Sequence, residues 1–77
     1  MLYIVTAAKV DNRGIRQTLR SYVVYAGNSQ EDARSEIVRE AYWYHDRGFK
    51  LLEYTPDYAS LQKGDIFVTM NITEGEF

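Results

Sequence analysis

The fold of this chain is decided by residues 29–48, which read SQEDARSEIVREAYWYHDRG. Ser29 is a favourable N-cap residue, and Glu31 and Asp32 put negative charge in the first turn, where the helix dipole favours it. Apolar side chains then recur every three or four residues, and Gly48 suits the position just past a helix end. We therefore predict a helix from about Gln30 to Arg47. Its buried face is expected to hold Ala33, Ile37, Ala41 and Tyr44, with Val38 on the flank.

Two strands precede this helix and form a hairpin. Residues 2–10 and 16–26 alternate in character, and Asp11 to Gly14 between them supplies turn chemistry. Arginine in a core is costly, so on the second strand we expect the face without arginine to point inward. The predicted inward faces comprise Leu2, Ile4, Ala8 and Val10 on the first strand, and Leu19, Ser21, Val23 and Tyr25 on the second.

Two more strands are predicted after the helix. The first covers residues 49–54, and a turn follows at Thr55 to Asp57. Residues 58–62 are interpreted as a single helical turn. Residues 65–72 alternate most clearly, with Ile66, Val68, Met70 and Ile72 on one face, and residues 73–77 are expected to be a loose acidic tail.

The order β-β-α-β-β predicts an α+β fold. The 77 residues suffice for one domain, and a helix that follows a hairpin covers one face of an antiparallel sheet. We expect a two-layer sandwich over residues 1–77, with a four-stranded, mostly antiparallel sheet and one helix on one of its faces.

The other face of that sheet is the first candidate binding site. Antiparallel sheets can leave one face open, and an exposed aromatic patch on a small protein usually marks an interaction site. A protein interface is the favoured interpretation, because Tyr and Arg are enriched at hot spots. The alternative is single-stranded nucleic acid, whose bases stack on rings while cations follow the phosphates. A third is that the rings merely lie flat on the sheet. The predicted contact residues are Tyr3, Arg16, Arg20, Tyr22 and Phe67.

An acidic helix face is the second candidate site. The net charge of −2 hides an asymmetry: residues 1–26 carry four basic residues and one acidic, and residues 27–77 carry five basic and ten acidic. Such a face suits a partner with a basic surface. The candidate residues on the helix are Glu31, Asp32, Glu36 and Glu40.

Catalysis is not predicted. His45 is the only histidine, and there is no cysteine to act as nucleophile or zinc ligand. The glycines sit at turns rather than in a phosphate-binding loop, so no metal and no cofactor are expected. Trp43 lies away from the buried helical face, and we expect it to pack against the loop near Pro56 or residues 58–62.

Composition bounds the location and the partners. The lack of cysteine fits a reducing cytoplasm, and no signal peptide or stretch of about 20 apolar residues that could cross a membrane is present. A core this small also makes a homodimer a reasonable expectation.

The layout resembles that of small phage-encoded accessory proteins, the anti-CRISPR proteins among them. The resemblance covers the whole chain and rests on its size, its lack of cysteine, its start on a strand (Met1 to Val5) and the β-β-α-β-β order. It implies a protein partner in the host cytoplasm: a small domain that occupies a nuclease or defence complex and blocks its nucleic-acid site.

Overall fold

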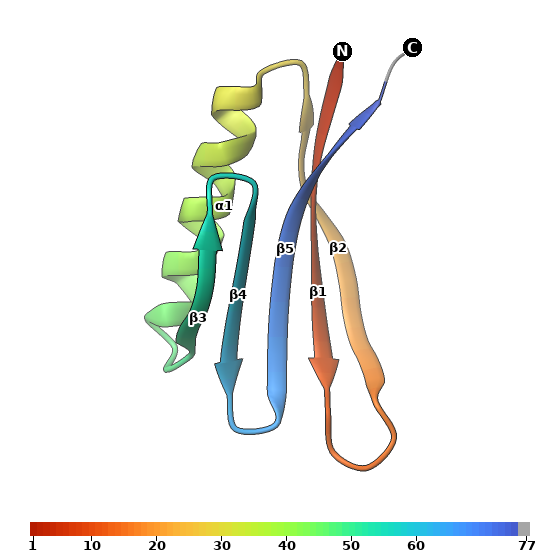
Figure 1. Cartoon of the computed structure of the whole chain (residues 1–77), viewed down its shortest axis with the longest axis vertical. Coiled ribbons are helices and arrows are strands. Elements are labelled where there is room, and N and C mark those ends of the chain that lie inside the picture. The colour runs from red at the N-terminus through yellow and green to blue at the C-terminus, as the bar shows by residue number, and fades with distance from the viewer. Residues whose placement is uncertain (76–77) are drawn as a thin grey trace.

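The computed structural model describes residues 1–75 and has one helix packed on a five-stranded antiparallel sheet. In chain order the elements are β1 (Leu2–Asp11), β2 (Gln17–Gly27), α1 (Gln30–His45), β3 (Lys50–Thr55), β4 (Tyr58–Lys63) and β5 (Ile66–Gly75). The strand order across the sheet is β2-β1-β5-β4-β3, so β2 and β3 are the edges (Figure 1). The α+β class is therefore confirmed, but the sheet has five strands and not four.

The additional strand is β4. Residues 58–62 were expected to form a helical turn, and that prediction is wrong. The segment pairs with β3 on one side and β5 on the other, and Ala59 and Leu61 are fully buried. Alanine and leucine favour helices locally, but pairing on both edges satisfies every backbone group of a short segment, which one helical turn cannot do.

The helix begins as predicted and ends slightly early. The Ser29 hydroxyl accepts a hydrogen bond of 3.1 Å from the backbone N–H of Asp32, as an N-cap should. The helix ends at His45, and the backbone then turns through Gly48, whose φ of +93° favours glycine. The tail prediction is wrong for residues 73–75, which extend β5; residues 76–77 lie outside the described part.

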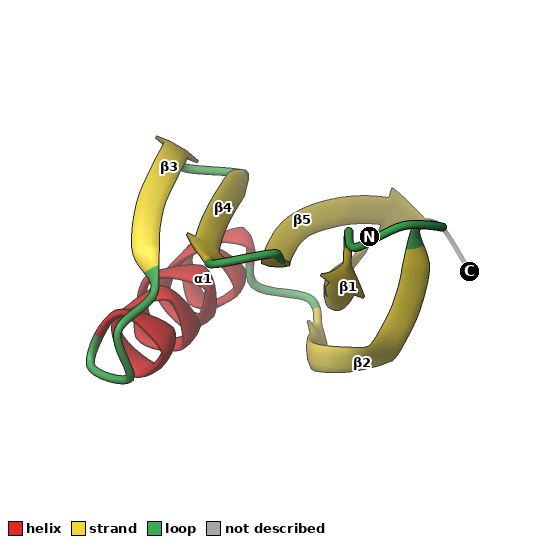
Figure 2. Ribbon diagram, turned by 90° about the horizontal axis from the view of Figure 1, so that it is seen from below, coloured by secondary structure: helices red, strands yellow, loops and turns green. Residues whose placement is uncertain are grey.

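The sheet curls, and α1 lies on its concave side. Figure 2 shows α1 beside β3 and β4 while β2 curves round toward the same side. Core residues come from α1, from the three inner strands β1, β5 and β4, and from Phe49 just before β3, whereas the edge strand β2 adds only half-buried side chains. The fully or nearly buried cluster comprises Val5, Ala7, Ala33, Ile37, Tyr44, Phe49, Ala59, Leu61, Val68 and Met70.

The prediction for the inward faces of β1 and β2 is largely wrong, although Val10 is buried and Tyr25 packs against the core as expected. Val5 and Ala7 are buried under α1, whereas Leu19 and Val23 are exposed by 48% and 60%. The register with β5 explains this result, because Ala7 lies opposite Met70, on the face that β5 turns toward the helix. The face predicted for β5 itself is confirmed: Val68 and Met70 are buried, and Ile66 and Ile72 pack against them.

Two irregularities in the β1–β2 pairing add to the difference from the prediction. Register shifts leave Val24 and Leu19 without a direct partner on β1, as at β-bulges. Val24 and Tyr25 consequently both pack against the core. A strict alternation along residues 16–26 therefore does not describe β2.

Candidate functional site

The residues predicted to form an open aromatic and basic face do not share a face. Tyr3 and Tyr22 lie on the helix side of the sheet and pack against the core. Phe67 belongs to the opposite face, since its neighbours along β5, Ile66 and Val68, point toward the helix. The predicted face is therefore wrong as a single surface. Strand alternation alone puts these residues on one face, but in the register of β1 with β5 Phe67 lies opposite Val10, on the other face from Tyr3.

The two arginines of that predicted site are exposed but separate from Phe67. Arg16 lies between β1 and β2, at the tip of the hairpin. The Arg20 guanidinium lies 4.6 Å from the centre of the Tyr22 ring, so Arg20 covers an inward-facing aromatic side chain. An arginine is tolerated on the helix side because its long side chain packs over the ring while the guanidinium stays in solvent.

Tyr22 is part of a polar cluster between β2 and α1. Its hydroxyl lies 2.7 Å from the Tyr44 hydroxyl and 3.1 Å from a carboxylate oxygen of Glu40, to which it donates. Partial burial, followed by the hydrogen bond with Tyr44 and the nearby Glu40 charge, raises the pKa of Tyr22 well above its usual value. The cluster attaches an edge strand to the helix, and Glu40 serves this contact.

The other acidic candidates lie along the helix. Glu31 and Asp32 are exposed in its first turn. Glu36 is half-buried and pairs with Arg39, with 3.3 Å between the charged groups. Of the four carboxylates, Glu31 and Asp32 are thus the most accessible.

The position of Trp43 differs from the prediction. The Trp43 and Tyr44 rings make a T-shaped contact with 5.0 Å between ring centres, and the Arg47 guanidinium lies 3.5 Å from the Trp43 ring centre. Arg47 also donates a 2.9 Å hydrogen bond to the Trp43 carbonyl. The residue that covers Trp43 therefore comes from the helix end rather than from the loop near Pro56.

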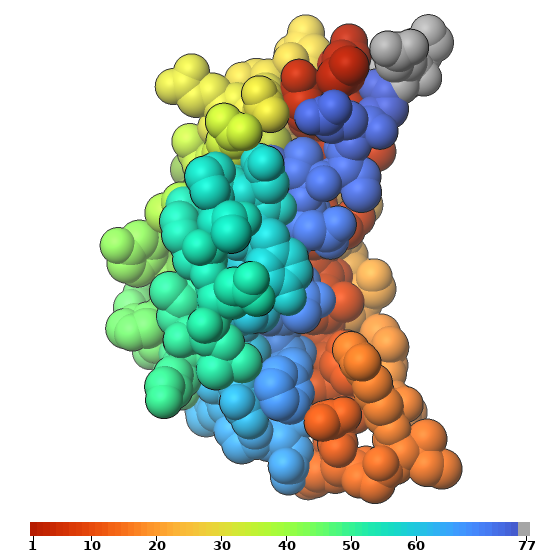
Figure 3. All heavy atoms as spheres, in the orientation of Figure 1, coloured from red at the N-terminus to blue at the C-terminus, as the bar shows by residue number. Residues whose placement is uncertain are grey.

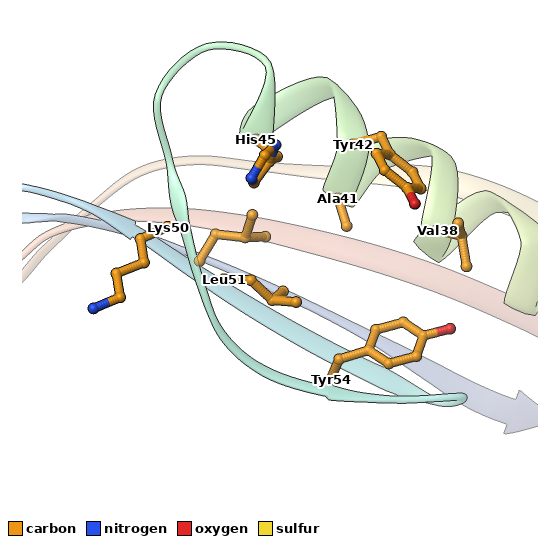
Figure 4. A pocket seen from close by; sticks show the side chains of 8 residues that line it. Val38, Ala41, Tyr42, His45, Lys50, Leu51 and Tyr54 are labelled. Carbon is orange, nitrogen blue, oxygen red and sulfur yellow. The ribbon is translucent and has the colours of Figure 1, made fainter.

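An apolar groove lies between α1 and β3, hereafter the α1–β3 groove. It has a volume of about 490 Å³ and a mostly apolar wall. In Figure 4 the side chains of Val38 and Ala41 point from the helix into the groove, Ala41 nearer to Leu51 of β3 and Val38 on the side of Tyr54. Its lining comprises Val38, Ala41, Tyr42, His45, Lys50, Leu51, Tyr54 and Leu61.

The groove exists because the helix covers the sheet unevenly. The stripe of Ala33, Ile37 and Tyr44 faces the inner strands and is buried. The neighbouring stripe on α1, which includes Val38, Tyr42 and His45, faces β3, where every residue is exposed. Tyr42, Leu51 and Tyr54 consequently remain 66%, 46% and 48% exposed. In the space-filling view, β3 lies at the molecular surface next to α1 (Figure 3).

A second hollow continues the groove toward the start of the helix. It shares Val38 and Tyr54 with the groove and reaches Glu31 and Pro56. At this end Arg34 donates a 3.0 Å hydrogen bond to the Asp57 carboxylate, which ties α1 to the β3–β4 turn. The hollow surface thus follows most of the length of α1.

Sequence reasoning missed this groove. The signal available in the sequence was the second stripe of Val38, Ala41, Tyr42 and His45, at spacings of three, one and three residues. The stripe indicates a groove only in combination with the position of β3 at the sheet edge beside it.

Within residues 1–75, no three side chains of the metal-binding types come together, and no helix is long and apolar enough to span a membrane. Comparison of the chain with models of known protein families, with curated proteins and with solved structures found no match.

Proposed function

We propose that this chain is a non-catalytic protein-interaction domain that binds an apolar segment of a protein partner in the α1–β3 groove. The observation that carries the proposal is the exposure of Tyr42, Leu51 and Tyr54 around a cavity of about 490 Å³. Small soluble domains seldom leave such a contiguous apolar hollow uncovered unless it binds something.

The chemistry of the groove favours a protein over nucleic acid. Tyrosine combines a large apolar ring with a hydroxyl group, which makes it a frequent anchor in protein interfaces. A nucleic-acid site needs cations that follow a chain of phosphates, but the groove lining holds only Lys50 and His45, both at one end. The aromatic and basic face that supported the nucleic-acid alternative does not assemble.

Within this class, we propose inhibition of a larger nucleic-acid-processing or defence complex as the biological role. The support is the small size and lack of cysteine on which the resemblance also rested, since the strand order differs from the one expected, and the acidic character of the chain, whose net charge is −2. Glu31, which lines the hollow that continues the groove, is placed to meet a basic surface of a partner bound there.

Affinity capture with a matched pair of variants tests the proposal. The tagged chain is used to capture proteins from an extract of its host, with and without nuclease treatment. Val38→Asp puts a charge into the groove, and Val23→Asp makes the same change on an exposed site of the opposite face. We expect a stoichiometric protein that survives nuclease, is lost with Val38→Asp and is retained with Val23→Asp.

The folding of both variants is checked by circular dichroism and thermal unfolding. A partner that is retained by a folded Val38→Asp variant would exclude the groove as its binding site. Loss of every partner after nuclease treatment would favour nucleic acid instead.

A further inference from the structure

We propose that two copies of this chain pair through the outer edge of β3, which would join the two sheets into one antiparallel sheet of ten strands. The inference goes beyond the proposed function, because it concerns the edge of β3 and not the groove on its inner side. The occupant that we assign to this edge is a second copy of the chain.

The first observation is that the outer edge of β3 is unpaired. The strand pairs with β4 on one side only, and all six of its residues are exposed. The exposed residues include Leu51, Leu52 and Tyr54, between 46% and 48% accessible. Exposed apolar side chains on an unpaired edge strand favour pairing with another strand.

The opposite edge, β2, differs in this respect. It carries two register shifts against β1, and two exposed arginines lie near its hairpin end, Arg20 on the strand and Arg16 in the adjoining turn. Bulges and like charges at an edge oppose pairing with another strand. β3 has one shift, at Leu52, and its two charges have opposite signs. Of the two edges, β3 is therefore the better suited to pair.

The second observation is that β3 is complementary to itself. Leu51 and Tyr54 lie opposite Leu61 and Ala59 of β4, which places both on the groove side of the strand. In an antiparallel pair centred between residues 52 and 53, Leu51 of one copy lies opposite Tyr54 of the other. An aliphatic–aromatic pair of this kind stabilises a sheet.

The charges match in the same arrangement. Lys50 and Glu53 lie opposite Gln62 and Ser60, which places both on the face away from the groove. Around the two-fold axis, Lys50 of each copy then lies diagonal to Glu53 of the other, which gives two attractive pairs per dimer. A two-fold contact of this type is closed, so the assembly stops at two copies.

Such a dimer would bring the two α1–β3 grooves together on one face. Each groove is bordered by Leu51 and Tyr54, which also face each other across the joined strands, next to the central Leu52–Glu53 pairs. The dimer would thus present one longer apolar trough between two helices. A partner with two apolar segments could bind both grooves with increased avidity.

Sedimentation velocity with charge-reversed variants of the full chain tests the inference. The variants are Lys50→Glu, Glu53→Lys and the double variant. We expect the unaltered chain to form dimers in the micromolar range, and each single variant to raise the dimer dissociation constant about tenfold or more, because both pairs become repulsive. The double variant restores attraction and should dimerise like the unaltered chain.

The decisive sample is an equimolar mixture of the two single variants. One chain then has two acidic residues at these positions and the other has two basic residues, so a mixed dimer is expected where neither variant dimerises alone. Arg16→Glu, which changes the charge equally at the opposite edge, should leave the dimer unchanged. Recovery in the mixture also excludes misfolding of the single variants.

Three results would overturn the inference: a monomer at all concentrations, no recovery in the mixture, or a dimer that Arg16→Glu weakens and Lys50→Glu does not. These outcomes are separate from the fate of the proposed function. A monomer that still captures a partner in a Val38-dependent way refutes the dimer alone. A dimer that captures nothing refutes the binding function alone.

Discussion

The hydroxyl groups of Tyr22 and Tyr44 lie 2.7 Å apart, and this contact joins the edge strand β2 to the helix. Tyr22 also donates to Glu40, so one side chain links β2 to two successive turns of α1. Because β2 curls round toward the helix (Figure 2), the cluster closes one side of the core. Tyr22 is therefore a structural residue, although its position in the sequence suggested an open binding face.

Removal of the Tyr22 hydroxyl should destabilise the domain. Tyr22→Phe leaves the Tyr44 hydroxyl and the half-buried Glu40 carboxylate short of a partner, at a cost of about 1–2 kcal/mol in the free energy of unfolding. Urea unfolding measures this value. Tyr42→Phe, at an exposed tyrosine, is the control and should change it by less than about 0.5 kcal/mol. Equal effects of the two changes would contradict the role given to the cluster.

The same tyrosine predicts a pH dependence of stability. The pKa of Tyr22 is raised in the folded state, mainly by burial and then by its hydrogen bond with Tyr44. The unfolded chain therefore loses this proton first, at pH values near 10, the usual pKa of tyrosine. The stabilisation is complete below that pH and declines as the pH rises above it.

Urea unfolding between pH 8 and pH 11 or so checks this dependence. The unaltered chain should lose stability with a steeper slope above about pH 10 than Tyr22→Phe, which has no proton to lose at this position. Parallel slopes for the two proteins would show that Tyr22 titrates normally in the folded state.

The N-cap at Ser29 provides a third test. Ser29→Ala removes the acceptor for the Asp32 backbone N–H and should lower the free energy of unfolding by about 1 kcal/mol. Ser35→Ala, inside the same helix at an exposed position, should be neutral or slightly stabilising because alanine is the better helix former. If the two changes have the same sign and size, Ser29 does not cap the helix in solution.

The fourth prediction concerns β4 as a core strand. Leu61→Ala deletes a fully buried side chain and should cost about 2–4 kcal/mol, measured by thermal or urea unfolding. Leu52→Ala makes the same change at an exposed position of β3 and should cost less than about 1 kcal/mol. A mild effect at Leu61 would support the helical turn expected from the sequence over the strand.

Sequence by itself determined the elements whose signals are local. The helix followed from one apolar stripe, the Ser29 cap and the glycine at position 48. The inward face of β5 followed from the alternation around Val68 and Met70, because the opposite choice would have exposed a row of large apolar side chains. These features depend on residues within a few positions of one another.

Only the tertiary structure decided the faces of β1 and β2, the strand β4 and the groove. Both faces of β1 carry apolar side chains, so alternation cannot choose between them, and the choice depends on β5, which lies more than fifty residues away in the chain. β4 is a strand because it is paired on both edges. The groove exists because one helix cannot cover five strands, and the strand left uncovered is set by the order in which the strands pair.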